Sequence, residues 1–325
     1  MRFLTAAAQL ATAGLLLAFV GCANAQQAYP SKPIHIIVTF APGGSNDILA
    51  RLYGPKLTEA WGQPVIVDNR PGANGVNGAV DLVKAAPDGH TLMMHSSTHI
   101  ITPLLVKVPY DTIKDFAPVS TVCLSEDVLV IHPSVPANNV RELIALAKSK
   151  PGELNFGSSG SGGSLHLAGE LFSLLAGIKM QHIPYKGAQP VVTDLMGGQV
   201  QVFFSPPIVV LPHVKSGKIK ALAVSGKQRM AALPQVPTFT EAGLPGFEVA
   251  VWQGFFAPAA TPKAIIDKLS AEIARITALP EINKALTNQG MEPFVAGPAQ
   301  FAAIIKADVA RWGKTIKTAN VKLEN

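Results

Sequence analysis

The sequence predicts an α/β fold of two lobes, each built on a mostly parallel sheet flanked by helices. Short apolar segments alternate with amphipathic helical segments along the chain, which is the rhythm of a parallel sheet covered on both faces. Without its N-terminal segment the chain keeps about 300 residues, more than one typical hydrophobic core holds, so two lobes are expected.

The first 25 residues have the pattern of a secretory signal peptide. Arg2 is their only charged residue, an apolar run fills positions 10–20, and Ala23-Asn24-Ala25 places small residues before Gln26. The run is too short to span a bilayer comfortably. We expect cleavage after Ala25. Acylation of Cys22 is the alternative, to which Phe19, three positions earlier, is poorly suited.

The charge and cysteine content of the mature chain exclude some functions. Loss of Arg2 leaves 26 basic and 21 acidic residues, a net charge of +5, which favours encounters with anions. The basic residues are scattered and do not interleave with aromatics, so nucleic-acid binding is not expected. Cys123 is then the one remaining cysteine, and its apolar neighbours indicate a buried, inert thiol.

An anion site is predicted after the first strand. The apolar residues 34–40 run directly into Ala41-Pro42-Gly43-Gly44-Ser45-Asn46-Asp47, and a helix begins at Ile48. Glycines allow a sharp turn, and the first helical turn leaves N–H groups free for a carboxylate or phosphate. The same residues are equally consistent with Ser45 or Asn46 as an N-cap and Asp47 as a first-turn acid, without a ligand.

Two further strands complete the first series. Residues 64–67 form the second strand, a loop leads to a helix over residues 76–85, and residues 91–95 form a buried third strand. Ligands of such sheets bind beyond the carboxyl ends of the strands. Ser96-Ser97-Thr98 follows the third strand at that position.

A second series repeats the arrangement. A strand over residues 128–131 and a helix over 140–148 are followed by a strand over 154–156, which leads into residues 157–164, the Gly/Ser loop. A flexible linker is the alternative. A linker is not normally bracketed so closely by a strand and a helix, so we expect an anion-binding nest. His166, in the next helix, suits a structural hydrogen bond as well as a ligand contact.

The remaining elements set the expected domain boundaries. We expect a strand and turn at 183–187, a helix at 191–196, strands at 200–204 and 219–224, an extended return at 249–256, and helices at 263–277, 280–289 and 298–318. The chain is thus divided into a signal peptide at 1–25, the first part of lobe 1 at 26–127, lobe 2 at 128–248, and the rest of lobe 1 at 249–325. Crossings near Asp127 and Glu248 are expected to act as a hinge.

Motifs along the whole mature chain resemble the Bug family, the extracytoplasmic substrate-binding proteins of tripartite tricarboxylate transporters. The segments that carry the resemblance are Tyr29 to Ile34, Phe40 to Arg51, Asn69 to Ala73, Pro87 to Thr91, Lys114 to Pro118, His166 to Leu171, Pro184 to Gly187 and Leu233 to Thr238. The resemblance implies a type II-like periplasmic binding protein, with a ligand cleft between its lobes. It implies a small carboxylate as ligand: a di- or tricarboxylate, an acidic amino acid or an aromatic acid.

The resemblance also implies the ligand contacts. These are Phe40, Pro42, Gly43, Gly44, Ser45 and Asp47 of the first loop, Ser96, Ser97 and Thr98 after the third strand, Ser158, Ser159, Gly160, Ser161 and Gly162 of the Gly/Ser loop, and Tyr185 and Ser205 on the other rim. A positive φ is expected at Gly44, so that Gly44→Val would block the backbone approach.

Three residues depart from the family pattern. Asn46 stands where threonine or alanine is common, His90 where tyrosine is frequent, and Thr102 where asparagine is usual. Asn46 lies in the binding loop and is expected to alter the polar contacts. Phe40, Tyr185, Phe204 and Trp252 suit either a flat-ligand pocket or the hydrophobic core.

The implied function is capture of the carboxylate for inner-membrane permease subunits by a monomer without a cofactor. A sensor subunit that presents the ligand to a membrane kinase would use the same pocket. A serine hydrolase is less well supported, because the Gly/Ser loop lacks the Gly-x-Ser-x-Gly spacing. Metal binding is not expected either, because HExxH and CxxC spacings are absent.

Overall fold

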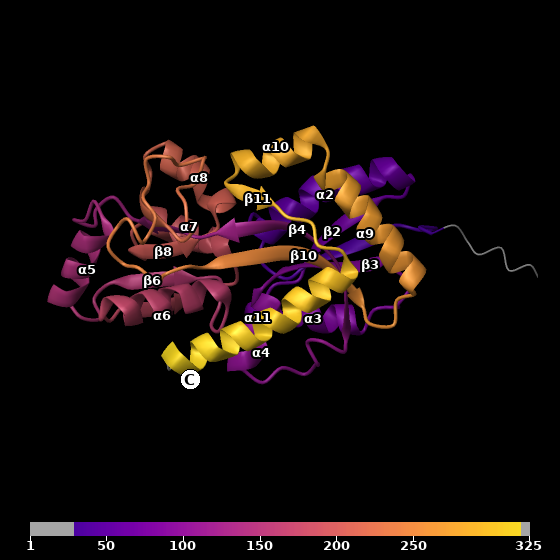
Figure 1. Cartoon of the computed structure of the whole chain (residues 1–325), viewed down its shortest axis with the longest axis horizontal. Coiled ribbons are helices and arrows are strands. Elements are labelled where there is room, and N and C mark those ends of the chain that lie inside the picture. Colours follow the sequence, from indigo (N-terminus) through magenta and orange to yellow (C-terminus); the bar gives the residue numbers. More distant parts are fainter. Residues whose placement is uncertain (1–28, 320–325) are drawn as a thin grey trace, which may run out of the picture. The chain divides into compact units, whose positions relative to one another are not determined.

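The computed structural model describes residues 29–319 of the 325-residue chain, so the predicted signal peptide and Cys22 lie outside the described residues. Of the N-terminal unit, Met1–Ser31, residues 29–31 are described, and the Tyr29–Pro30 peptide bond is cis. From Lys32 onward the chain forms one compact unit. This unit contains two β-sheets with helices packed around them (Figure 1).

The first sheet has six strands in the order β11-β4-β10-β3-β1-β2. They are β1 (Ile34–Val38), β2 (Val65–Asn69), β3 (Thr91–Ser96), β4 (Phe116–Glu126), β10 (Ala250–Pro258) and β11 (Met291–Pro293). β1 pairs in parallel with β2 and β3, and β10 lies antiparallel between β3 and β4. β11 pairs antiparallel with β4. Strands β1 to β4 therefore share one direction.

The second sheet has five strands in the order β7-β6-β8-β5-β9. They are β5 (Val128–Ile131), β6 (Asn155–Ser158), β7 (Gln181–Pro184), β8 (Val202–Ser205) and β9 (Lys220–Val224). β6 pairs in parallel with β7 and β8, and β5 lies antiparallel between β8 and β9. Each sheet thus has a parallel majority with a reversed strand inserted, and the predicted α/β class is confirmed.

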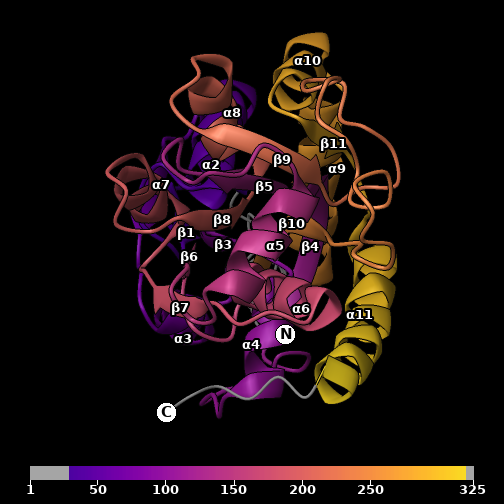
Figure 2. The ribbon, with the colours of Figure 1, turned by 90° about the vertical axis from the view of Figure 1, so that its left-hand side faces the viewer.

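Helices cover both sheets, as Figures 1 and 2 show. Around the first sheet lie α2 (Ser45–Trp61), the 3-10 turn η2 (Ala73–Gly75), α3 (Val76–Val83), α4 (Thr98–Leu105), α9 (Lys263–Thr277), α10 (Pro280–Asn288) and α11 (Pro298–Ala319). Around the second lie α5 (Val140–Ser149), α6 (Ser164–Ala176), α7 (Ala188–Met196) and α8 (Pro207–Lys215). We call the first sheet with its helices the first lobe, and the second sheet with its helices the second lobe.

Local signals in the sequence fix several helix ends. The Asn139 side chain caps α5 by accepting from the N–H of Glu142 at 2.9 Å, and the Glu142 carboxylate accepts from the N–H of Asn138 at 2.7 Å. Gly62 and Gly177 end α2 and α6 at φ +68° and +60°. Side chains other than glycine are strained in this left-handed region, so glycine stops the helix there.

The two sheets are joined where β4 passes into β5. Asp127 alone separates these strands. Its N–H donates to Ser225 Oγ at 2.7 Å, and its carbonyl accepts from the N–H of Ser225 at 2.9 Å. Ser225 Oγ in turn donates to the carbonyl of Val249, just before β10. The outgoing and returning segments are therefore tied together, while the predicted domain boundaries and hinge stay predictions.

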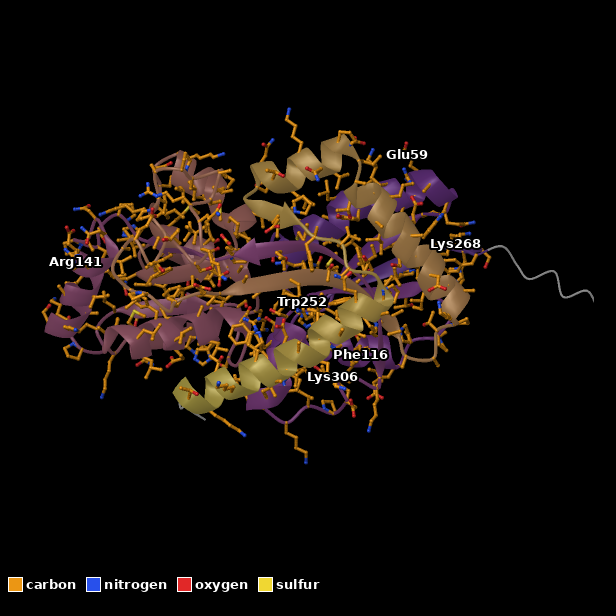
Figure 3. All side chains as sticks on the ribbon, viewed as in Figure 1. Glu59, Phe116, Arg141, Trp252, Lys268 and Lys306 are labelled. Atoms are coloured by element: carbon orange, nitrogen blue, oxygen red, sulfur yellow. The ribbon has the colours of Figure 1, made fainter. Side chains whose placement is uncertain are left out.

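Aromatic side chains of both lobes belong to one hydrophobic core. In the second lobe, Phe172, Phe204, Phe239 and Phe247 pack with ring centroids 4.1–6.4 Å apart. In the first lobe, Trp252 of β10 lies under α11 (Figure 3) and its Nε1–H donates to Asp308 at 3.0 Å. Phe204 and Trp252, which suited either a pocket or the core, thus lie in the core.

Candidate functional site

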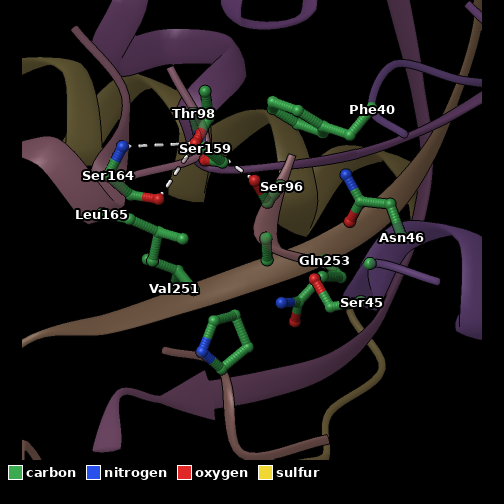
Figure 4. Close-up of a pocket in the computed structure, with 13 residues that line it drawn as sticks. Phe40, Ser45, Asn46, Ser96, Thr98, Ser159, Ser164, Leu165, Val251 and Gln253 are labelled. Atoms are coloured by element: carbon green, nitrogen blue, oxygen red, sulfur yellow. Dashed lines mark hydrogen bonds between the residues drawn. The ribbon is translucent and has the colours of Figure 1, made fainter. Parts of the chain in front are cut away.

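A cavity lies between the lobes at the carboxyl ends of β1, β3, β6 and β8 (Figure 4). It encloses about 420 Å³ of space not filled by atoms, part of it open to solvent. Its lining residues are Phe40, Gly44, Ser45, Asn46, Ser96, Thr98, Val251 and Gln253 from the first lobe, and Ser159, Ser164, Leu165, Ala188 and Pro206 from the second.

The loop after β1 turns at Gly43. Gly43 has φ +79°, whereas Gly44 is extended, with φ −77° and ψ 169°. The expected positive φ at Gly44 is therefore wrong, because the turn occurs one residue earlier. A Cβ at Gly43 would lie 3.1 Å from Cγ of Gln189, while a Cβ at Gly44 would meet only the Ala41 carbonyl at 3.5 Å.

Asp47 holds this loop in shape through hydrogen bonds that its carboxylate accepts outside the cavity. Its carboxylate accepts from the N–H of Gly43 at 2.9 Å, from Arg51 Nε at 3.0 Å and from Asn69 Nδ2 at 3.0 Å. Burial raises the pKa of this carboxyl, but the hydrogen bonds from Arg51, Gly43 and Asn69 outweigh it and hold the pKa below its usual value. Both oxygens are occupied, and Asp47 is not part of the cavity wall.

The Gly/Ser loop faces two adjoining cavities. Ser159 lines the first cavity, and Gly160 and Ser161 line a second one of about 660 Å³ that shares Phe40 and Ser159 with it. Tyr185 also lines the second cavity, with its hydroxyl donating to Asp194 at 2.6 Å.

The predicted contacts thus divide into two groups. Those lining the two cavities are Phe40, Gly44, Ser45, Ser96, Thr98, Ser159, Gly160, Ser161 and Tyr185. Those outside both linings are Pro42, Gly43, Asp47, Ser97, Ser158, Gly162 and Ser205. Several of the latter make internal bonds: Ser205 Oγ donates to the Pro206 carbonyl at 3.1 Å, and the Gly162 N–H donates to His166 Nδ1 at 3.1 Å. His166 thus makes the structural hydrogen bond that its position suits.

Ser158 and His182 lie within hydrogen-bond distance, as the serine nucleophile and the general base of a serine hydrolase would. Ser158 Oγ lies 2.6 Å from His182 Nε2, but Ser158 is fully buried and its Oγ also accepts from the N–H of Gly160. Burial, with His166 stacked on the ring at 3.8 Å, lowers the pKa of His182 to about 3. Such an imidazole is a poor general base near neutral pH.

Several wall residues were not predicted as contacts. They are Asn46, Ser164, Leu165, Ala188, Pro206, Val251 and Gln253. Ser164 and Ala188 begin helices that directly follow β6 and β7, a signal already visible in the alternating pattern. Gln253 belongs to β10, which inserts from the distant end of the chain, and its Oε1 accepts from the buried Cys123 thiol at 3.3 Å.

The cavity is electrically neutral but polarised. None of its thirteen lining residues has a charged side chain. Five helices begin at its wall: Gly44 and Ser45 start α2, Thr98 starts α4, Ser164 starts α6, Ala188 starts α7 and Pro206 caps α8. The N-terminus of a helix carries free N–H groups and the positive end of its dipole. Five of them converge on one neutral space.

Two kinds of feature are absent from the described part of the chain. Within residues 29–319, no group of three or more His, Cys, Asp or Glu side chains is arranged to hold a metal ion. No helix in that range has the length and apolar character needed to cross a membrane.

Comparisons with known proteins give concordant results. A family model described as "Tripartite tricarboxylate transporter family receptor" matches residues 49–321. The periplasmic binding protein BugD is 32% identical, with a TM-score of 0.88, over 91% of this chain and all of that one. Rpa4515 of R. palustris, solved with adipate, is 33% identical with a TM-score of 0.88, over 90% of this chain and 99% of that one. MatC from Rhodopseudomonas palustris, solved with bound malate, is 30% identical with a TM-score of 0.85, over 89% of this chain and all of that one.

Proposed function

The chain belongs to the tripartite tricarboxylate transporter receptor family, as its resemblance to the Bug proteins predicts. We propose that it captures a small carboxylate in the periplasm. The convergence of five helix N-termini on one neutral cavity carries the proposal. A carboxylate there accepts from backbone N–H groups and from hydroxyls such as those of Ser45, Thr98 and Ser159. The site needs no cationic side chain, because the helix dipoles supply the positive potential.

The adipate and malate held by the two related structures support this ligand class. The ligand-contact residues proposed here are those lining the first cavity, together with Gly160, Ser161 and Tyr185 of the second. Gly43 and Asp47 hold the first loop in shape.

Native mass spectrometry tests ligand capture. Protein exported by a bacterial host and purified without added acid is expected to carry a bound small carboxylate, which is released in the instrument and detected as an anion. A retained cation or neutral sugar would contradict the proposal. Edman sequencing of the same sample is expected to begin at Gln26. An acylated Cys22 would instead indicate a lipid-anchored protein.

We further propose that the bound form delivers its ligand to an inner-membrane permease of the tripartite tricarboxylate type. Cross-linking in membranes is expected to join the ligand-loaded protein to the permease subunits. Cross-linking to a sensor kinase instead would favour the sensor role.

A further inference from the structure

Asn46 has an unsatisfied hydrogen-bonding group at the cavity. Its side chain is 3% exposed and lines the cavity wall, and its Oδ1 has no hydrogen-bond partner. In Figure 4 the amide extends from the first turn of α2 into the cavity, opposite the ring of Phe40. The neighbouring Asp47, by contrast, has both carboxylate oxygens bonded.

An unpartnered buried amide oxygen is unfavourable, because it gives up hydrogen bonds to water without replacement. In a binding site a donor on the ligand can satisfy it. A carboxylate has no proton to donate to Oδ1, so the group that meets this oxygen is a second polar group of the ligand.

The potential in the cavity decides which donor fits. Five helix N-termini place positive partial charge around this space, and no acidic side chain belongs to its wall. A ligand ammonium would be repelled there. A neutral hydroxyl can donate a hydrogen bond to Asn46 Oδ1 as an ammonium would, and the positive potential does not repel it.

Three other hydroxyls of the wall already have partners within the protein. Thr98 Oγ1 lies 3.0 Å from Ser164 Oγ, and the Thr98 N–H donates to Ser96 Oγ at 3.4 Å. Leu165, Val251 and Pro206 provide an apolar side to the cavity. Among the residues lining this cavity, Asn46 Oδ1 is the buried side-chain atom that has no hydrogen-bond partner.

We propose that Asn46 is a specificity-determining residue that selects hydroxycarboxylates over the corresponding acids without a hydroxyl. This inference rests on the proposed function and narrows its substrate class.

Titration calorimetry with matched acids tests the inference. The pairs are lactate and propionate, malate and succinate, 2-hydroxyglutarate and glutarate, and mandelate and phenylacetate. For the pair that binds most tightly, the wild-type protein is expected to bind the hydroxy acid at least about tenfold more tightly, the effect of one good hydrogen bond to a buried group.

Asn46→Leu keeps the branched shape of the side chain and removes the amide. It is expected to bring the ratio of the two affinities close to one, chiefly by weakening the hydroxy acid. Asn283→Leu makes the same change on the exposed surface of α10 and is expected to preserve the wild-type ratio. Circular dichroism and thermal melting verify that each variant is folded.

The possible outcomes separate this inference from the proposed function. Equal wild-type affinities for the two members of the pair, or an unchanged ratio in folded Asn46→Leu, would overturn the role of Asn46 and leave carboxylate capture intact. If no acid of either kind bound the wild-type protein, both the proposed function and the inference built on it would be wrong.

Discussion

The hydroxyls of Thr98 and Ser164 lie 3.0 Å apart and join the first turn of α4 in the first lobe to the first turn of α6 in the second. A second bridge runs beside them. Thr102 Oγ1 accepts from Asn74 Nδ2 at 2.7 Å and donates to the carbonyl of Gly162 at 3.2 Å. These buried bonds link the lobes next to the cavity, so they stabilise the arrangement in which the two walls face one another.

Thr102→Val is expected to weaken this arrangement. Valine keeps the shape of threonine but leaves Asn74 and the Gly162 carbonyl without a partner, which costs about 1–3 kcal/mol. If ligand binding requires the joined lobes, affinity should fall by about tenfold. Calorimetry with the acid identified by mass spectrometry measures this, and the exposed Thr287→Val of α10 serves as control. Unchanged affinity in Thr102→Val would show that the bridge does not support the bound state.

Gly43 and Gly44 are expected to respond differently to alanine. Gly43→Ala forces a side chain into φ +79° and toward Gln189, so stability should fall by about 1–2 kcal/mol. Gly44 is extended and has room for a Cβ, so Gly44→Ala should fold normally while crowding the N–H groups at the start of α2. Urea unfolding and ligand titration together separate the two effects. A loss of stability in Gly44→Ala alone would refute this assignment.

Asp127 is expected to make the protein less stable as pH rises. Both its oxygens are buried without partners, and burial, with Glu126 beside it, raises its pKa to about 7. The folded chain then keeps a proton that the unfolded chain releases between about pH 4 and 7, so stability falls with pH across that window. Across the whole of this window the free energy of unfolding falls by about 4 kcal/mol.

Asp127→Asn removes this titration while keeping the side-chain shape. Thermal unfolding between pH 5 and 8 should therefore show a shallower pH dependence and a higher midpoint at pH 8 than the wild type. The exposed Asp81→Asn is the matched control and should follow the wild type. A variant as pH-sensitive as the wild type would place the titrating group elsewhere.

The regular α/β segments could be predicted from the sequence because their patterns are local. The helix over residues 263–277 and the strand beginning at Thr91 coincide with α9 and β3 to within one residue. Several elements were not expected, among them β4 and α4. β4 carries Pro118 and the buried polar residues Ser120 and Thr121, which interrupt the apolar pattern, and α4 contains Pro103.

Sequence reasoning identifies the parts of the candidate site that are formed by a single loop. The turn before α2 and the Gly/Ser loop are both visible as glycine-rich segments between a strand and a helix. Gln253 and Val251 reach the cavity through the insertion of β10 between β3 and β4, with pairings over more than 120 residues that no local pattern encodes. Asp47 is one of the contacts that the resemblance implies, but hydrogen bonds from Arg51 and Asn69 occupy its oxygens, which sequence alone does not show.

The converging helix N-termini are proposed to recognise negative charge without a cationic side chain. Titration of the wild-type protein with the identified acid and with its carboxamide, which has the same shape and no charge, tests this recognition. We predict a loss of affinity of at least about a hundredfold for the carboxamide, since charge-assisted hydrogen bonds are roughly twice as strong as neutral ones. Equal affinities for the acid and the carboxamide would contradict the account.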